Sequence, residues 1–214
     1  MTRIDLFGAV GDAWEEGFTV SSVAAQLDAA GDSELLVRIN SPGGFADDGV
    51  AIYNMLAERK PRVEILGIAA SAASVIAMAG ETIEMRKGAR MMIHDAWTVT
   101  LGDPKAHAEA FDRLDSLSDQ MAAIYAGRTG ADPTQIRGWM KAEKWMDGNE
   151  AAEHGFATAI AEEAAEGEPA IAQSVLATMG CQTTLEQADA DRKRQINRRA
   201  FTRYRVQQLT AHRV

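Results

Sequence analysis

Ser71 is the residue of this sequence best placed to act as a nucleophile. It lies in the run Gly67–Ser74 (GIAASAAS), where an apolar strand gives way to a small-residue helix and no neighbour is larger than isoleucine. A sharp strand-to-helix turn needs such small neighbours and projects the serine hydroxyl out of the fold. The free N–H groups at the start of the helix suit a developing oxyanion. The alternative is a structural serine in a closely packed helix.

His94 is the candidate base for that hydroxyl. It ends the apolar run Met91–His94, and an imidazole titrates near neutral pH, which suits proton transfer from a serine. A structural histidine beside apolar residues is the alternative. The remaining histidines are weaker candidates, because they lie on a polar helix flank, before a helix-ending glycine and in the C-terminal tail: His107, His154 and His212.

Two consecutive glycines follow another strand, in Asn40–Gly44 (NSPGG). Glycine adopts backbone conformations closed to other residues, and without a Cβ atom its N–H group can approach a ligand closely. In an acyl-transfer site such a turn would supply a hydrogen-bond donor to the oxyanion. A plain turn is the alternative.

Together the three motifs resemble the proteolytic subunit of the Clp protease. The serine of GIAAS follows Gly44 by 27 residues, and the histidine of MMIH follows that serine by 23. The resemblance extends over residues 4–160 and implies a serine endopeptidase that works through an acyl-enzyme. It makes Ser71 the nucleophile and His94 the base. The backbone N–H groups of Gly44 and Ala72 match the oxyanion hole of the family.

The third member of the catalytic triad departs from the family pattern. Where the family has an aspartate two residues before an aromatic, this chain has Glu143-Lys144-Trp145. A glutamate can orient the imidazole and stabilise its charged form as an aspartate does. Asp147 and Asp95 lie nearby in the sequence and are alternatives. Glu143 can also be a solvated charge beside Lys144.

Within the family the sequence is most similar to the head-maturation proteases of phages and prophages, which trim scaffold and capsid proteins. That subgroup shares a glutamate in the E-x-W-[FM] position and a short start, here with a first strand at about Ile4. The resemblance also implies a homo-oligomer of stacked rings, usually of seven subunits, with protein or peptide substrates and no cofactor. It leaves dependence on an ATPase partner open.

These residues require an α/β scaffold to position them. Apolar periodicity and glycine or proline breakers predict strands that alternate with helices, which indicates a mostly parallel sheet. The resemblance implies the superfold that Clp proteases share with crotonases, with a protruding helical handle whose apolar stripe runs from Phe111 to Ile124. The predicted strands are 4–10, 34–40, 62–68, 83–85 and 91–94; the predicted helices are 18–30, 46–58, 69–80, 105–127, one that starts at 133, and 149–154.

Charge and composition exclude several function classes. The net charge is −9, and the segment Arg192–Val214 has eight basic and no acidic residues, so the rest of the chain is strongly acidic. An acidic body repels phosphates, which argues against a nucleic-acid-binding core. The chain has no apolar run of about 18 residues and no signal-peptide layout, and its single cysteine, Cys181, excludes an intrachain disulfide. These features predict a cytoplasmic protein, in the host cytoplasm if phage-encoded, with no membrane partner.

The predicted organisation has three parts. Residues 1–160 form the peptidase domain, and 161–188 form an acidic, alanine-rich linker or extension. Residues 189–214 form a basic tail that either docks on an acidic surface or is a disordered extension. Two other functions compete with the peptidase. An inactive ring subunit or binding module would keep the fold without a working triad. A crotonase-type acyl-CoA enzyme would not need the pair of Ser71 and His94.

Overall fold

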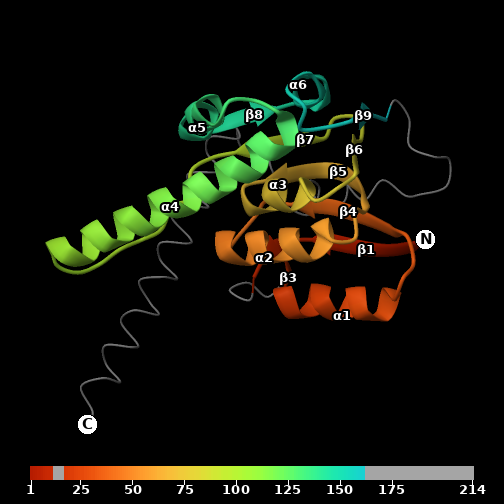
Figure 1. Ribbon diagram of the computed structural model, residues 1–214, viewed down its shortest axis with the longest axis horizontal. Helices are drawn as coiled ribbons and strands as arrows, with labels where there is room; N and C mark the ends of the chain where they lie inside the picture. Colours follow the sequence, from red (N-terminus) through yellow and green to blue (C-terminus); the bar gives the residue numbers. More distant parts are fainter. Residues whose placement is uncertain (12–16, 162–214) are drawn as a thin grey trace, which may run out of the picture. The chain divides into compact units, whose positions relative to one another are not determined.

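The computed structural model of the chain describes residues 1–11 and 17–161 (Figure 1). Residues 12–16 and 162–214 lie outside the described residues, and with them nearly all of the predicted linker, the basic tail, Cys181 and His212. The chain divides into two units, one of Met1–Trp97 with Ala108–Glu168 and one of Thr98–His107 with Pro169–Val214. Only Thr98–His107 of the second unit is described.

Seven strands form one sheet in the first unit. Five parallel strands follow one another across it in the order β1 (Thr2–Phe7), β4 (Leu35–Ser41), β5 (Arg62–Ala70), β6 (Thr82–Met85) and β9 (Ala159–Ile160). Strand β7 (Arg90–Ile93) pairs in parallel with the last part of β5, and β8 (Lys144–Met146) runs antiparallel to β7. A separate small sheet joins β2 (Ala9–Val10) to β3 (Gly17–Phe18). The mostly parallel sheet confirms the predicted fold class.

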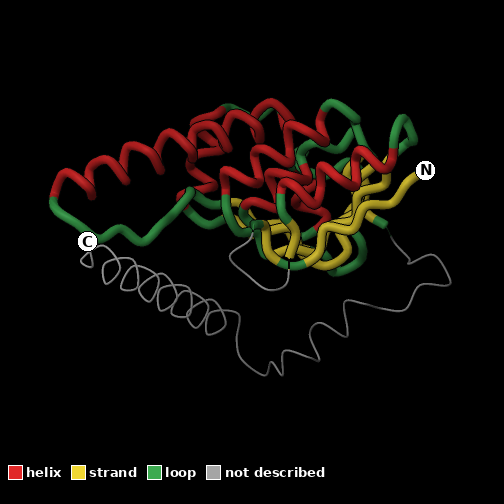
Figure 2. The backbone as a smooth tube through the Cα atoms, turned by 90° about the horizontal axis from the view of Figure 1, so that it is seen from below, coloured by secondary structure: helices red, strands yellow, loops and turns green. Residues whose placement is uncertain are grey.

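The helices lie to one side of the strands (Figure 2). They are α1 (Val20–Ala30), α2 (Ala46–Ala57), α3 (Ala72–Ala77), α4 (Pro104–Thr129), α5 (Pro133–Lys141) and α6 (Gly148–Glu153). Helix α5 begins at Pro133, as predicted, and Asp132 caps it by accepting a hydrogen bond from the N–H of Thr134. Among the described helices, none is long and apolar enough to cross a bilayer.

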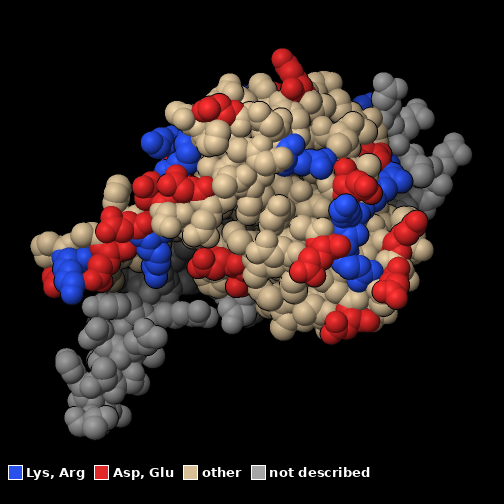
Figure 3. Space-filling model, in the orientation of Figure 1, with Lys and Arg blue, Asp and Glu red and all other residues tan. Residues whose placement is uncertain are grey.

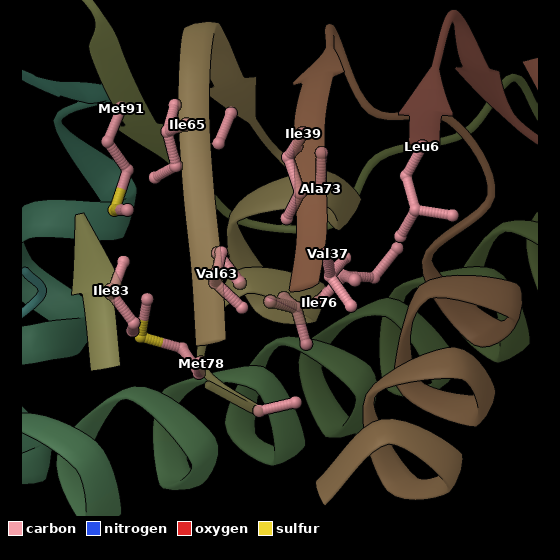
Figure 4. Packing of buried hydrophobic residues seen from close by; sticks show 14 of the residues in the cluster. Leu6, Val37, Ile39, Val63, Ile65, Ala73, Ile76, Met78, Ile83 and Met91 are labelled. Carbon is pink, nitrogen blue, oxygen red and sulfur yellow. The ribbon is translucent and has the colours of Figure 1, made fainter. Parts of the chain in front are cut away.

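The core lies between the helices and one face of the sheet. Alternate residues of the central strands point to this face, as the two-residue period of a strand requires, and they are buried: Ile4, Leu6, Val37, Ile39, Val63 and Ile65. Figure 4 shows Val37 and Val63 close to Ile76 of α3. Every residue of α3 is fully buried or nearly so. This burial explains why the helix is built from small and β-branched side chains.

The opposite face of the sheet carries a row of charges. The strand registers align Asp5, Arg38, Glu64 and Glu84 across four neighbouring strands. Arg38 donates from Nε and Nη2 to the carboxylate of Asp5 at 2.8 and 2.9 Å, and Arg86 donates to Glu64 at 2.9 Å. These pairings of opposite charge allow Arg38 and Glu64 to be only 4% and 5% exposed.

Two predicted elements have the wrong limits. Residues 69–80 are predicted to be helical, but Ala69 and Ala70 extend β5 and pair with Met91 and Met92 of β7. Hydrogen bonds to a neighbouring strand therefore override the helical propensity of alanine at these positions. The predicted strand over 4–10 is divided at Gly8, which has a φ of 82°, into β1 and β2. The short strands β3, β8 and β9 are missing from the prediction.

Helix α4 extends the predicted handle at both ends. Its C-terminal half packs on the core through Met121, Ala122 and Tyr125, all buried. Phe111, the first residue of the predicted apolar stripe, is 68% exposed. Figure 3 shows acidic side chains along this part of the molecule, and the exposed acidic residues of α4 beyond its first turn are Glu109, Asp112, Asp115 and Asp119.

Candidate active site

Ser71 occupies a strained turn between β5 and α3. Its φ and ψ are 56° and −127°, a backbone conformation that residues other than glycine rarely adopt. Within the described residues only Lys60, Ser71 and Glu143 combine a side chain with a positive φ. Such strain persists only where the surrounding structure enforces it, and it is concentrated at functional sites. The turn has the geometry that projects a nucleophilic serine from the top of a sheet.

His94 lies within hydrogen-bonding distance of that serine. It is the first residue after β7, and its Nε2 atom is 2.7 Å from Oγ of Ser71. The parallel pairing of β5 with β7 explains why the two side chains lie close together. Ala70 pairs with Met92, and both strands then end on the same side of the sheet, where Ser71 and His94 follow. Both side chains are partly exposed. The sequence motifs at 71 and 94 are therefore brought together in space.

The diglycine turn passes directly against the serine. Gly43 has a φ of 88°, and a methyl group on it would lie 2.5 Å from the carbonyl oxygen of Ala70 and 2.7 Å from Cβ of Ser71. A methyl group on Gly44 would lie 2.1 Å from the carbonyl oxygen of Val10. Real side chains never approach backbone so closely, so both positions require glycine.

The amides of Gly44 and Ala72 border the same turn. Gly44 forms a parallel bridge with Val10 of β2. In this bridge the N–H of Val10 donates to the carbonyl oxygen of Gly43, and the N–H of Phe45 donates to the carbonyl oxygen of Val10, each at 3.0 Å. The N–H of Gly44, between these two bonds, therefore points away from Val10. Ala72 is the first residue of α3, where N–H groups have no partner within the helix. A methyl group on Gly43 would lie 3.0 Å from the nitrogen of Ala72, so the two turns are in contact.

Glu143 and His94 each lie one residue beyond the last pair of the antiparallel ladder between β7 and β8. Ile93 is opposite Lys144 in this ladder, so one step further along each strand leads to His94 and Glu143. The backbone of Glu143 turns sharply there, with a φ of 49°, and its side chain is exposed. The neighbouring Lys144 forms an ion pair with Glu150.

The two alternative carboxylates have other partners. Oδ1 of Asp95 lies 3.6 Å from Nη1 of Arg137 in an ion pair. Asp147 is the N-cap of α6 and accepts a hydrogen bond from the N–H of Glu150 at 2.9 Å. Asp147 thus satisfies a helix end, and Asp95 is oriented toward a cation on α5.

The other described histidines lie in different surroundings. The ring of His154 stacks on Trp139, with 4.5 Å between the ring centroids. His107 is exposed and belongs to the second unit. Among the histidines of residues 1–11 and 17–161, only His94 forms a hydrogen bond with Ser71.

Sequence reasoning missed three residues that support the site. Ser74 and Tyr125 form a hydrogen-bonded chain to the carbonyl oxygen of Ser71, and Ser118 accepts a hydrogen bond from the N–H of Ala96. Ser74 and Tyr125 are 51 residues apart in sequence. Their pairing depends on how α4 docks on α3, so neither the spacing nor the composition of the chain carries a signal for it.

Comparison with known proteins agrees with this geometry. The family model for Clp protease matches residues 8–164. The ATP-dependent Clp protease proteolytic subunit of Pleurastrum terricola is 33% identical over 150 residues, which cover 67% of this chain and 76% of that protein. The subunit of the same name from Spinacia oleracea is 32% identical over 138 residues, with coverages of 61% and 69%.

Among solved structures, a mutant of ClpP1 from Listeria monocytogenes has the same fold. It superposes with a TM-score of 0.65 at 23% sequence identity, over 75% of this chain and 91% of that one. The matched family segment includes the diglycine turn, the Ser71 turn and the strand before His94. By its sequence and its fold, the chain belongs to the Clp protease family.

Proposed function

We propose that the protein is a serine endopeptidase in which Ser71 is the nucleophile and His94 the general base. The observation that carries this proposal is the 2.7 Å distance between Nε2 of His94 and Oγ of Ser71, at a turn where Ser71 has a positive φ. Membership of a family of proteolytic subunits supports the same reaction class.

The geometry suits acyl transfer. As Oγ of Ser71 attacks the carbonyl carbon of a peptide bond, its proton passes to Nε2 of His94. The tetrahedral intermediate then breaks its C–N bond, and the proton on His94 goes to the leaving amine. Water deacylates the resulting ester by the same steps in reverse order, again with His94 as base. Serine and histidine both return to their starting protonation states.

The negative charge of the intermediate would be stabilised by the N–H groups of Gly44 and Ala72. The first points away from its strand partner and the second lies in the first turn of α3, beside the nucleophile. Because these are backbone donors on fixed turns, they need no rearrangement when the charge develops. Loss of one such donor lowers turnover by about 10²–10³-fold in serine proteases.

Glu143 is our candidate for the third member of the triad. When Nε2 of His94 faces Ser71, Nδ1 is left to a second partner, and a carboxylate there would hold the ring and stabilise the imidazolium. The register of β7 with β8 supports Glu143 in this role, whereas Asp147 caps a helix and Asp95 pairs with Arg137.

Peptide cleavage tests the reaction class. The full chain should cleave members of a fluorogenic peptide library, with internal cut sites identified by mass spectrometry. Ser71→Ala should lose this activity, and Ser33→Ala, a change at an exposed serine, should retain it. Absence of cleavage in the wild-type chain would favour an inactive ring subunit or binding module.

The finer assignment is that the enzyme processes scaffold or capsid proteins during phage head maturation. The glutamate in Glu143–Met146 (EKWM) supports this subgroup. We further propose that it acts as a homo-oligomer of stacked rings, because its relatives are named as subunits and Phe111 is largely exposed. Native mass measurement tests the assembly. Cleavage of the scaffold protein produced from the same phage or prophage tests the substrate.

A further inference from the structure

Two buried hydroxyl groups lie on one face of helix α4. The side chains of Ser118 and Tyr125 are 1% and 0% exposed. They are seven residues apart, which places them two turns from each other on the same face of an α-helix. Each hydroxyl belongs to a short chain of hydrogen bonds, and the two chains lead to the two halves of the candidate active site.

The first chain ends at the backbone of the nucleophile. Oγ of Ser74 lies 2.6 Å from the carbonyl oxygen of Ser71 and 2.8 Å from the hydroxyl of Tyr125. A carbonyl oxygen can only accept, so the single hydroxyl proton of Ser74 is donated to Ser71. Tyr125 must then donate to Ser74. Burial raises the pKa of the Tyr125 phenol, so this donor keeps its proton in neutral solution.

The second chain ends at the segment that follows the base. The N–H of Ala96 donates to Oγ of Ser118 at 3.0 Å, and this hydroxyl donates to the carbonyl oxygen of Leu114 at 2.8 Å. Strand β7 ends at Ile93, so His94 lies just beyond the last ladder pair. The bond from Ala96 to α4 therefore restrains the chain two residues after His94, where the sheet no longer does.

We propose that Ser118 and Tyr125 are positioning residues that hold Ser71 and His94 at hydrogen-bonding distance. This inference rests on the proposed peptidase function. Ser71 needs an external restraint because its backbone is strained, and His94 needs one because it lies beyond the ladder. Helix α4 supplies both restraints from one rigid face. A displacement of the reacting atoms by about 1 Å can cost about 10²-fold in rate.

Arg137 of α5 reinforces the second restraint. Its guanidinium contacts Asp95 at 3.6 Å, and it contacts Asp115 and Asp119 of α4 at 2.7 and 3.3 Å. Asp95 is the residue between His94 and Ala96. The same short segment is thus joined to α4 twice, once through Ser118 and once through Arg137.

The test compares Ser118→Ala and Tyr125→Phe with matched controls. Ser116→Ala removes an exposed hydroxyl from the same helix. Tyr53→Phe removes a half-buried phenol that makes no hydrogen bond to residues 1–11 or 17–161. We expect each test variant to lower kcat about three- to tenfold with KM unchanged, the effect of one lost hydrogen bond. The rate at which a fluorophosphonate probe labels Ser71 should fall by the same factor.

Amide hydrogen exchange tests the positioning independently of activity. Exchange should accelerate at Ala96 in Ser118→Ala and at Ser71 in Tyr125→Phe, and at neither position in the control variants. If the wild-type chain neither cleaves peptides nor reacts with the probe, the proposed function fails, and the exchange data alone decide whether α4 restrains the two segments.

Two results would overturn the inference. One is unchanged exchange at Ala96 and Ser71 in the test variants. The other is an active wild-type enzyme whose kcat and labelling rate stay within twofold of the controls in both test variants, or fall only as far as the fraction of folded protein falls. Thermal unfolding of each variant measures that fraction.

Discussion

The N–H group of Ser71 donates a hydrogen bond to the carbonyl oxygen of Met92, 2.9 Å away. This bond fixes the strained turn to strand β7 two residues before His94. The serine and histidine are 23 residues apart in sequence, and the parallel pairing of β5 with β7 is the direct reason that they meet. The sheet therefore brings the two segments together, and the contacts from α4 restrain them beyond the end of the ladder.

If Ser71 and His94 act as one catalytic unit, the losses of kcat from replacing each of them should not be additive. Ser71→Ala and His94→Ala should each lower kcat by more than about 10⁴-fold, because either change removes proton transfer from the nucleophile. The double variant should be no more than a few-fold worse than either single variant. Steady-state peptide hydrolysis measures all three. Losses that multiply in the double variant would mean that the two residues act independently.

Replacing each candidate carboxylate by its isosteric amide identifies the third member of the triad. Glu143→Gln should lower kcat by about 10²–10⁴-fold, less than Ser71→Ala, because the imidazolium loses its stabilising charge while the nucleophile and base remain. Asp95→Asn and Asp147→Asn should keep kcat within about tenfold of the wild type. A larger loss in Asp95→Asn or Asp147→Asn than in Glu143→Gln would assign the role to that aspartate instead.

The diglycine turn offers a matched pair of glycine substitutions. Gly43 and Gly88 both have a positive φ, 88° and 79°, but a methyl group on Gly88 meets no atom within 4 Å. Gly88→Ala should therefore cost only the backbone strain, about 1–2 kcal/mol of stability. Gly43→Ala should also displace Ser71 and lower kcat by about 10²-fold. Equal kcat values in the two variants would show that the turn does not position the serine.

The buried phenol of Tyr125 predicts a stability change at high pH. Its pKa is raised by desolvation in the folded state, whereas an unfolded tyrosine ionises near pH 10. Above about pH 10 the unfolded chain therefore releases a proton that the folded chain retains, and the folded state loses stability as the pH rises. Urea unfolding from pH 8 to pH 11 should show wild type weakening relative to Tyr125→Phe. A difference that stays constant across this range would contradict the prediction.

The sequence predicts the elements of this fold better than their contacts. The motifs at 40–44, 67–74 and 91–94 identify the segments that meet. Glycine indicates a tight turn, and runs of small or apolar residues indicate buried helices and strands. The predicted start of α3 is wrong because Ala69 and Ala70 pair with β7 and belong to the sheet. Local propensity contains no information about that neighbour.

The parts of the site that the sequence does not predict depend on tertiary packing. Antiparallel β8 has only three residues, Lys144–Met146, too few for a periodic signal. The link from Tyr125 through Ser74 to Ser71 joins α4 to α3 across 51 residues. Phe111 follows the apolar stripe of its helix and is still exposed, because the stripe continues past the end of the core that covers it.

The most direct test of the central claim is covalent labelling of Ser71. The full chain is incubated with a serine-directed fluorophosphonate probe, digested and analysed by mass spectrometry. We predict one adduct, on the peptide that contains Ser71, which is absent from Ser71→Ala and formed far more slowly in His94→Ala. Wild-type protein that acquires no adduct, or acquires it equally in His94→Ala, would contradict the assignment of a histidine-activated serine.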